Sequence, residues 1–346
     1  MKWKTLFAFA ALAALAAVIW RYRGDSERSD LNFFAMDTPV TLTAYGRGAP
    51  EALREAERCV RALERELSVT DSRSAVSRLN SGEPVAADGT AGKAVGLSLE
   101  LCAETDGAFD PTLYPALRAW GFTTGEHRVP PPSQLTELLA RTGPARVKLE
   151  NGTFRLDEGA MIDLGGIGKG LASDAAAELL RKSGVKSAVL NLGGNVRTLG
   201  KRPGGGSWRI GVRDPDGGLL GVIETGEGAV ITSGSYERFF EKDGVRYWHI
   251  LDPKTGAPAR SGVVSVTVVG SSGARCDALS TAYFVMGPER AARLFMSEHP
   301  DAQRFEVTLY GSLAKTGRGH GTDRVSTETL APWPVTVLWN NDETLR

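Results

Sequence analysis

The fold is decided by the stretch Ala160–Asn195, which reads AMIDLGGIGKGLASDAAAELLRKSGVKSAVLNLGGN. A short apolar run ends at Asp163, and four glycines follow within six residues. A stripe of apolar residues from Leu171 predicts a helix, and Val185–Leu192 predicts a second strand. We therefore expect a crossover unit of strand, glycine turn, helix and strand.

The glycine turn has the properties of a phosphate site. Glycine adopts positive φ and lets a ligand approach the backbone, while a helix N-terminus carries a partial positive charge. Lys169 adds a full charge, and Asp163 and Asp174 lie close in the sequence. The turn thus predicts a site for a phosphate or pyrophosphate. A tight connection without a ligand is the alternative, because the spacing fits neither the P-loop nor G-x-G-x-x-G.

Composition limits the class of protein. The 346 residues contain 41 Lys plus Arg and 41 Asp plus Glu, so the net charge is zero. Proteins that bind nucleic acid normally have a basic excess, so this balance argues against nucleic acid as a partner. Cys59, Cys102 and Cys276 are too far apart to indicate a metal pair or a disulfide framework.

The N-terminus predicts export. Lys2 and Lys4 precede an uncharged run from Thr5 to Trp20, so residues 1–22 have the pattern of a signal peptide or signal anchor. The apolar run continues through Val18–Trp20, which favours an uncleaved anchor in the inner membrane. We expect residues 23–30 to be a tether and 31–346 to be one domain on the periplasmic side, anchored or released. A buried helix of a cytoplasmic protein is the alternative.

The rest of the chain mixes helical and strand patterns. Leu31–Tyr45 predicts a strand, and Pro50–Leu67 predicts a helix. Ser133–Arg141 predicts a helix with Ser133 as N-cap, and Val147–Leu156 predicts a hairpin that turns at Asn151–Gly152. Gly311–Thr327 is polar and glycine-rich. The expected fold class is α/β, or mixed α+β, with central mixed sheets.

Two further patterns suggest chemistry. Asp277, Ser280 and Thr281 open a predicted helix, and their spacing places three oxygens on one face, as magnesium prefers. Ordinary helix capping is the alternative. His249 ends the predicted strand Val245–Leu251, where it could act as a general acid or base or be a structural histidine. Thr232–Gly234 and Tyr236 are candidates for a pocket wall.

Nine stretches resemble the FAD:protein FMN transferases, the ApbE family, between about residues 33 and 310. They are AMDTPVTLTAYG, LSVTDSRSAVSRLN, GAFDPTLYPALRAWGF, IDLGGIGKGLASD, NLGGNVRTLG, WRIGVRDP, ITSGSYERFF, HILDPKTGAPA and CDALSTAYFVMG. The resemblance implies that the chain cleaves the pyrophosphate of FAD with magnesium. FMN would pass to a threonine or serine hydroxyl of an acceptor protein, and AMP would leave.

The resemblance also assigns residues. Asp277, Thr281 and the carbonyl of Gly168 would hold magnesium, and His249 would assist the transfer. FAD would contact Met36, Ala108, Phe109, Asp110, Gly165, Leu171 and Leu251, and Lys169 would add its charge at the glycine turn. The implied acceptor is an exported domain of a membrane redox complex. Some family members serve complexes that supply electrons to nitrous-oxide reduction.

The chain departs from the family pattern at two positions. Family members often have Gly after the early Met, where this chain has Asp37, and they often have Tyr or Trp where this chain has Thr70. The first change puts a charge near the flavin, and the second removes a ring that would stack. Two other functions remain open: an FAD pyrophosphatase that uses water as acceptor, and a flavin carrier without turnover.

Overall fold

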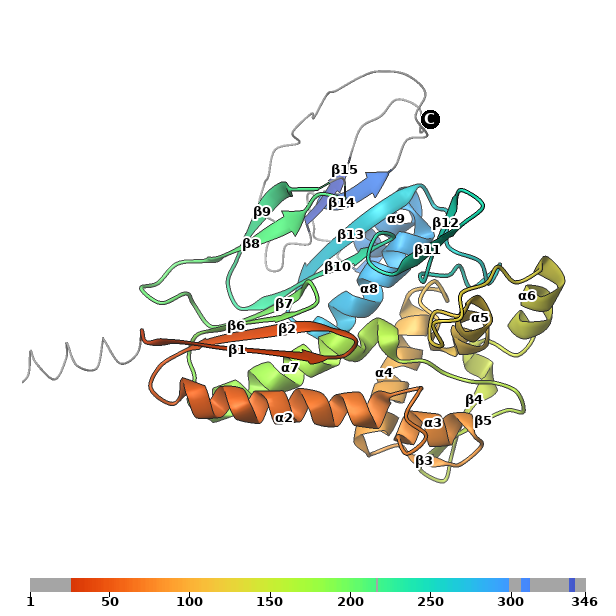
Figure 1. Ribbon diagram of the computed structural model, residues 1–346, viewed down its shortest axis with the longest axis horizontal. Helices are drawn as coiled ribbons and strands as arrows, with labels where there is room; N and C mark the ends of the chain where they lie inside the picture. Colours follow the sequence, from red (N-terminus) through yellow and green to blue (C-terminus); the bar gives the residue numbers. More distant parts are fainter. Residues whose placement is uncertain (1–25, 216, 299–305, 312–335, 340–346) are drawn as a thin grey trace, which may run out of the picture.

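The computed structural model describes residues 26–215, 217–298, 306–311 and 336–339 (Figure 1). The expected signal segment 1–22 and all but the first residue of the polar stretch 311–327 lie outside these residues. Within the described part of the chain, no helix combines the length and the apolar character that crossing a membrane requires.

An eight-stranded sheet forms the centre of the fold (Figure 1). Its strands, in spatial order, are β1 (Arg28–Ala35), β2 (Thr38–Tyr45), β6 (Ala188–Leu192), β7 (Asn195–Leu199), β10 (Gly228–Gly234), β13 (Val263–Gly270), β14 (Glu306–Gly311) and β15 (Thr336–Trp339). Neighbours are antiparallel except β14 and β15, which are parallel. The expected mixed α/β class is confirmed.

Three helices cover one face of this sheet: α2 (Ala49–Leu67), α7 (Gly165–Lys182) and α8 (Gly273–Met286) (Figure 1). Their apolar sides and the inward residues of the strands form the core beneath the sheet. The hairpin of β8 (Trp208–Arg213) and β9 (Leu219–Thr225) packs Trp208 and Ile210 on the opposite face, against Val196, Val230 and Val269. The sheet is therefore buried on both sides along its middle strands.

A second group of elements lies beyond the tip of the β1–β2 hairpin (Figure 1). It contains α3 (Ala75–Asn80), α4 (Thr90–Glu104), α5 (Tyr114–Trp120) and α6 (Pro132–Leu139), with strands β3 (Val85–Ala86), β4 (Val147–Glu150) and β5 (Thr153–Leu156). The hairpin β11 (Phe239–Lys242) and β12 (Val245–Trp248) and helix α9 (Pro288–Glu298) complete the described elements beside two short 3₁₀ turns. Phe109, Ile167 and Ala278 share one apolar cluster, which joins this group to α7 and α8.

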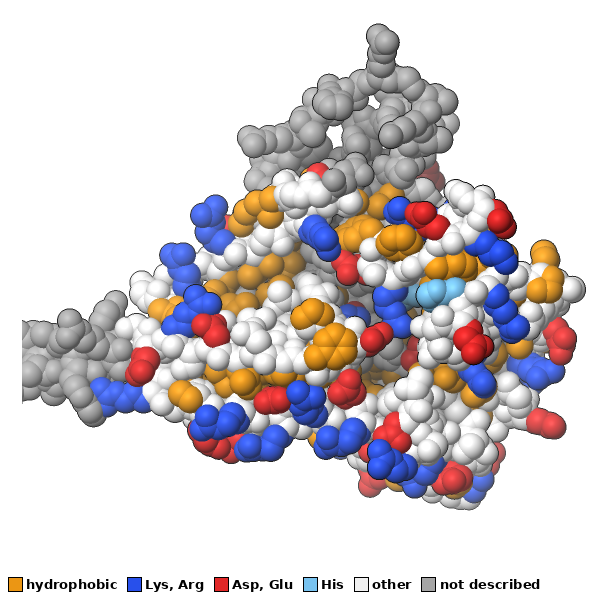
Figure 2. Space-filling view, viewed as in Figure 1, with side chains coloured by type: hydrophobic (Ala, Val, Ile, Leu, Met, Phe, Trp, Pro, Cys, Tyr) orange, Lys and Arg blue, Asp and Glu red, His pale blue; other side chains and the backbone are white. Residues whose placement is uncertain are grey.

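Charge is finely mixed over the face shown in Figure 2. Acidic and basic side chains alternate there, most clearly along the lower edge, instead of gathering into fields of one sign. The electrostatic potential over this face therefore changes sign over short distances.

The glycine-rich segment is the start of a helix and not a turn, so the expected crossover unit is wrong in its first strand and its turn, while the predicted helix and second strand are confirmed. Helix α7 begins at Gly165, all four glycines lie in its first two turns, and none of them has positive φ. Residues 160–164 form no strand. Two of the glycines serve packing: a Cβ added at Gly166 would lie 2.7 Å from the Phe109 ring, and one at Gly170 would lie 2.3 Å from the carbonyl oxygen of Gly273.

The predicted strand Leu31–Tyr45 is a hairpin. Its first strand begins at Arg28, inside the expected tether, because the residues from Arg28 to Ala35 pair with β2. Met36 and Asp37 form the two-residue turn with φ of 54° and 59°. Left-handed residues at both positions are what a tight hairpin turn with the twist of its strands requires.

Other boundaries differ in ways that affect the site. Helix α6 has Pro131 at its N-cap and Ser133 inside, so Ser133 does not cap it. Helix α8 begins at Gly273 after the N-cap Ser272, which places Asp277 one turn inside the helix. Strand β12 ends at Trp248, and His249 follows it in a loop. The predicted helix Pro50–Leu67 and hairpin Val147–Leu156 are confirmed.

Candidate active site

A pocket of about 330 Å³ opens where the hairpin tip, the start of α7 and the loops after β10 and β12 meet. The residues that line it are Met36, Asp37, Thr38, Ala108, Phe109, Asp110, Pro111, Leu113, Leu117, Phe122, Thr123, Asp163, Gly165, Gly166, Lys169, Gly193, Asn195, Thr232, Ser233, Gly234, Glu237, Arg238, His249, Ile250, Leu251, Asp277 and Thr281. Segments far apart in the sequence therefore converge on one cavity.

The pocket gathers most of the residues that the sequence marked. Those that line it are Met36, Ala108, Phe109, Asp110, Gly165, Lys169, His249, Leu251, Asp277 and Thr281. Gly168 and Leu171 lie on α7 outside the lining, and Leu171 packs against the apolar core. Thr232–Gly234 belong to the wall, whereas Tyr236 is not among the lining residues, and its hydroxyl lies 3.2 Å from Ser265 Oγ.

Asp277 is the most buried charged group of the pocket, with 3% of its surface exposed. The backbone N–H of Gly170 donates to its Oδ2 and the side-chain amide of Asn195 donates to its Oδ1, both at 2.9 Å. The Lys169 ammonium lies 3.9 Å from Oδ1. Burial raises the pKa of this carboxyl, and the charge of Lys169 opposes the rise.

Two hydroxyls lie beside this carboxylate on α8. The Ser280 and Thr281 side chains each donate to the backbone oxygen of Asp277, at 2.9 and 3.3 Å. Ser233 Oγ on β10 lies 2.7 Å from Ser280 Oγ and 3.3 Å from Thr281 Oγ1. These contacts connect the helix to the sheet and fix Thr281 at the pocket wall.

The residues present suit a hard cation. The Asp277 carboxylate accepts two hydrogen bonds and has further acceptor sites, and the nearby hydroxyl is also an oxygen donor, as magnesium prefers. The nearest cation in this contact, the Lys169 ammonium, lies 3.9 Å from the buried Asp277 carboxylate, so a metal ion bound closer to the carboxylate would stabilise its negative charge. No three Asp, Glu, His or Cys side chains cluster as a metal site within the described ranges, so a cation here depends on hydroxyl, carbonyl or ligand oxygens.

His249 follows β12 and is held through its main chain and its ring. Its backbone N–H donates to the carbonyl oxygen of Arg238 at 3.1 Å, and its Nδ1 lies 3.2 Å from the same oxygen. A carbonyl oxygen only accepts, so Nδ1 carries the proton of the neutral ring and Nε2 is the free acceptor. Burial, reinforced by the charges of Arg238 and Lys169, lowers the pKa of His249 to about 3.

Burial raises the pKa of two other carboxyls that line the pocket. Asp163 accepts a hydrogen bond from the N–H of Gly165 at 3.0 Å, at the first turn of α7, and burial raises its pKa. Asp110 accepts from the N–H and the hydroxyl of Thr112 at 2.8 and 2.6 Å, and burial raises its pKa as well. Gly165, Gly166 and Lys169 face the cavity, so the positive end of the helix dipole lies at its wall.

Asp174 holds α8 in position from α7. Its Oδ1 accepts hydrogen bonds from Gly273 N and Arg197 Nε, both at 2.9 Å. Its Oδ2 accepts from Ala274 N at 3.1 Å. The helix that carries Asp277 and Thr281 is thereby capped by the helix that carries Lys169.

Asn195 and Arg238 are pocket residues that the sequence patterns missed as functional candidates. Asn195 lies in the quoted stretch NLGGN and Arg238 in ITSGSYERFF, but neither pattern shows that the first contacts Asp277 or that the second contacts His249 through its carbonyl. The packing of α8 against β7 brings Asn195 to Asp277, and the pairing of β11 with β12 brings Arg238 to His249.

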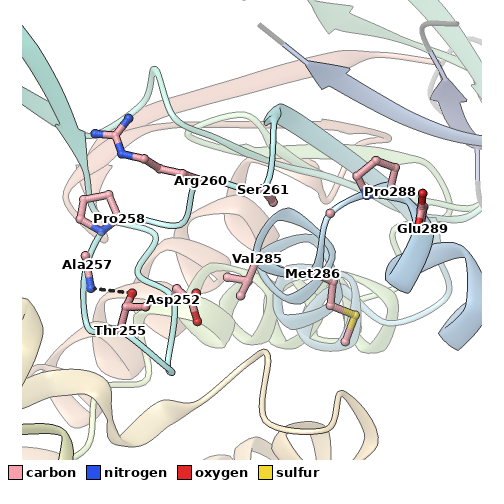
Figure 3. Close-up of a pocket in the computed structure, with 11 residues that line it drawn as sticks. Asp252, Thr255, Ala257, Pro258, Arg260, Ser261, Val285, Met286, Pro288 and Glu289 are labelled. Atoms are coloured by element: carbon pink, nitrogen blue, oxygen red, sulfur yellow. Dashed lines mark hydrogen bonds between the residues drawn. The ribbon is translucent and has the colours of Figure 1, made fainter. Parts of the chain in front are cut away.

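A second pocket, of about 610 Å³, is lined by residues of the segments 252–261 and 285–289 (Figure 3). Its wall includes Asp252, Thr255, Arg260 and Glu289. Thr255 Oγ1 accepts from the N–H of Ala257 at 3.3 Å, as Figure 3 shows, and Asp252 Oδ1 accepts from the N–H of Lys254. Both side chains thus stabilise their own loop. The first pocket has the buried carboxylates and the histidine, so we assign the chemistry to it.

Comparisons with known proteins point to one family over most of the chain. A sequence model described as the ApbE family matches residues 36–305. A second, described as the serine dehydratase beta chain, matches residues 280–334, which include only Thr281 of the pocket.

Relatives of the chain have a common name. A "FAD:protein FMN transferase" of Treponema pallidum is 36% identical over 265 residues, covering 70% of this chain and 73% of the relative. One from Vibrio cholerae is 35% identical over 245 residues, covering 68% and 73%.

Solved structures extend the likeness to the fold. The crystal structure of the ApbE protein from Thermotoga maritima matches with a TM-score of 0.74 at 36% identity, covering 80% of this chain and 92% of that one. The flavin transferase ApbE from Vibrio cholerae matches with a TM-score of 0.71 at 31% identity, covering 79% and 92%. With the family match over residues 36–305, these likenesses show that the chain belongs to the ApbE family.

Proposed function

We propose that this protein is an FAD:protein FMN transferase, which moves FMN from FAD to a threonine or serine hydroxyl of an acceptor protein and releases AMP. The observation that carries the proposal is the convergence of Asp277, Thr281, Lys169 and His249 on one pocket in a chain of the ApbE family. Positive charge beside the phosphates and a base beside the nucleophile are what phosphoryl transfer needs.

Binding of the diphosphate falls to α7 and its lysine. The positive end of the α7 dipole and the Lys169 ammonium attract phosphate oxygens, and Asp277 with Thr281 would hold magnesium. Bound magnesium supplies charge that neutralises phosphate oxygens. We include Gly168 and Leu171 in the proposed site on the family resemblance alone, with the Gly168 carbonyl as a further magnesium ligand.

His249 takes the proton. The acceptor hydroxyl oxygen attacks the phosphorus of the FMN half, and its proton passes to the free Nε2 of His249. The new phosphoester P–O bond forms while the P–O bond to the AMP half breaks, so AMP leaves with the bridging oxygen. The lowered pKa keeps the imidazole neutral and ready to accept at pH 7, although it also makes His249 a weak base.

The test is a transfer reaction with purified protein, FAD, magnesium and a flavin-accepting domain of a redox protein. The proposal expects fluorescent flavin on the denatured acceptor, a mass increase equal to FMN, and one AMP per flavin. Asp277→Ala should lose at least about a hundredfold of this rate. Glu241→Gln removes a surface carboxylate that pairs with Arg246 and should react like the wild type.

The outcomes separate the alternatives. AMP release without modification of the acceptor would establish a pyrophosphatase in place of a transferase. FAD binding with neither product would establish a carrier. Equal rates for wild type and Asp277→Ala would contradict the proposed metal site.

We also propose that the protein is exported, with residues 1–22 as signal anchor, and that its acceptor belongs to a membrane redox complex on the periplasmic side. The charged start and the apolar run after it support this. Fractionation of cells that make the full chain should find it with the inner membrane and open to protease added from the periplasm. Recovery from the cytoplasm would contradict the proposal.

A further inference from the structure

The mouth of the pocket is bridged by an ion pair between two of its lining residues. Arg238 Nη2 lies 3.5 Å from Asp37 Oδ2. Arg238 comes from the loop after β10, and Asp37 from the tip of the β1–β2 hairpin. The pair therefore connects the tip of the hairpin with the loop after β10.

The hairpin tip that presents Asp37 is fixed from α2. Glu64 Oε1 accepts a hydrogen bond from the backbone N–H of Met36 at 2.7 Å, and Arg61 Nη1 donates to the carbonyl oxygen of Phe34 at 3.1 Å. Asp37 adopts φ of 59°, a conformation that Asp tolerates better than most residues. The carboxylate of Asp37 is thus held at the mouth by the turn itself.

The ion pair is weak and can be exchanged. Its side chains are 49% and 72% exposed, and pairs of this kind contribute about 0–1 kcal/mol. The separation of 3.5 Å exceeds that of a charge-assisted hydrogen bond, ~2.8 Å. Among the described residues, the guanidinium makes its hydrogen bond from Nη2 alone, to the carbonyl oxygen of Phe122 at 2.9 Å. Its other N–H donors remain for a ligand.

Arg238 and Lys169 act on the same space. Both cations lower the pKa of His249, and both oppose the rise in the pKa of Asp163. The two positive charges therefore face the part of the pocket between the start of α7 and the loop after β12. A ligand with two phosphates needs two such charges, and a guanidinium matches phosphate oxygens with its planar fork.

We propose that Arg238 is a phosphate-binding residue of this pocket and that Asp37 is its partner in the empty pocket, displaced when the dinucleotide binds. The inference rests on the proposed function, because FAD is the ligand that brings the phosphates. Asp37 then lowers the affinity for FAD, since its contact with Arg238 must be given up.

The test compares ligands with and without phosphate. Binding of FAD, FMN and riboflavin is measured by equilibrium dialysis in EDTA, where no turnover occurs. We expect Asp37→Asn to tighten FAD and FMN about fivefold, the equivalent of an exposed ion pair, and to leave riboflavin unchanged. Arg238→Ala should weaken FAD roughly tenfold or more and riboflavin less than about twofold.

A double variant decides whether the two residues act together. In the Arg238→Ala background, Asp37→Asn should change the FAD dissociation constant less than about twofold, because the competition is gone. Glu241→Gln controls for the loss of one surface carboxylate and should bind all three ligands like the wild type. Arg238→Lys should fall between wild type and Arg238→Ala, because it keeps the charge and loses the fork.

Three results would overturn the inference. The first is an unchanged FAD affinity in Asp37→Asn, and the second is an equal shift for riboflavin. The third is that Asp37→Asn tightens FAD binding equally in the wild type and in the Arg238→Ala background. If Arg238→Ala fails to fold, the comparison of FAD with riboflavin in Asp37→Asn still decides. If the wild type binds FAD but transfers no FMN, the proposed function is wrong. The measured affinities would still decide whether Arg238 binds phosphate.

Discussion

Gly170 and Gly273 meet backbone to backbone where α7 crosses α8. A Cβ on Gly170 would lie 2.3 Å from the carbonyl oxygen of Gly273, and a Cβ on Gly273 would lie 2.8 Å from the carbonyl oxygen of Gly170. A Cβ at either distance would push the two helices apart, so the crossing requires glycine at both positions. The crossing also sets the distance between Lys169 on one helix and Asp277 on the other.

Gly170→Ala should therefore destabilise the protein by about 2 kcal/mol, because the added methyl forces the two helices apart. Gly168→Ala is the matched control, since a Cβ there has no heavy atom within 4 Å and alanine favours a helix. Chemical denaturation should show a lower midpoint for the first variant and an equal or higher one for the second. Equal midpoints for both variants would contradict the role of the glycine crossing.

Asp174 stabilises the same crossing by charge and capping. Asp174→Ala removes the carboxylate that caps the N–H groups of Gly273 and Ala274 beside the N-cap Ser272, and it leaves the guanidinium of Arg197, a residue only 8% exposed, without its carboxylate. We expect a loss of about 3 kcal/mol in the free energy of unfolding. Asp174→Asn keeps an oxygen for the N–H groups and should lose less. A loss as large as that of alanine would mean that the charge, and not the cap, carries the effect.

Local patterns predicted much of this fold, because a helix stripe or a hairpin turn is decided by neighbouring residues. Pro50–Leu67 and the turn at Asn151–Gly152 are examples. The glycine segment looks like a turn in the sequence because the need for glycine there comes from a tertiary contact. Gly170 packs against Gly273, which lies far away in the sequence. The sequence does not indicate a role for Arg238 for a similar reason. Its backbone carbonyl oxygen contacts His249, and a pattern of side chains cannot predict a backbone contact.

Asn195 positions the proposed metal ligand. Its amide donates to Asp277 Oδ1 at 2.9 Å, and Asn195 is only 1% exposed. Asn195→Ala should raise the magnesium concentration for half-maximal transfer about tenfold, the effect of losing a residue that orients a ligand. The affinity for FAD in EDTA should change less than about twofold. Asn191→Ala, on the exposed side of β6, is the control. An equal loss in both variants would count against a specific role for Asn195.

His249 predicts how stability depends on pH. In the folded protein its pKa is lowered to about 3, by burial first and then by Arg238 and Lys169, so the ring stays neutral above that value. In the unfolded chain the imidazole binds a proton near pH ~6.5. Between these values the unfolded state binds more protons, so stability rises with pH up to about 6.5 and is lost as the pH falls towards 3.

A single group gives a slope of at most about 1.4 kcal/mol per pH unit. His249→Gln removes the group, so the unfolding free energy of the wild type minus that of the variant should be constant above pH ~7 and should decrease below pH ~6.5. Urea denaturation at several pH values measures this difference. His127→Gln changes a ring that stacks on Phe240 and leaves His249 in place, so it should keep the wild-type dependence. If the difference in unfolding free energy between wild type and His249→Gln does not vary with pH, His249 binds a proton equally well in the folded and the unfolded protein. That result would contradict a neutral His249 as the base.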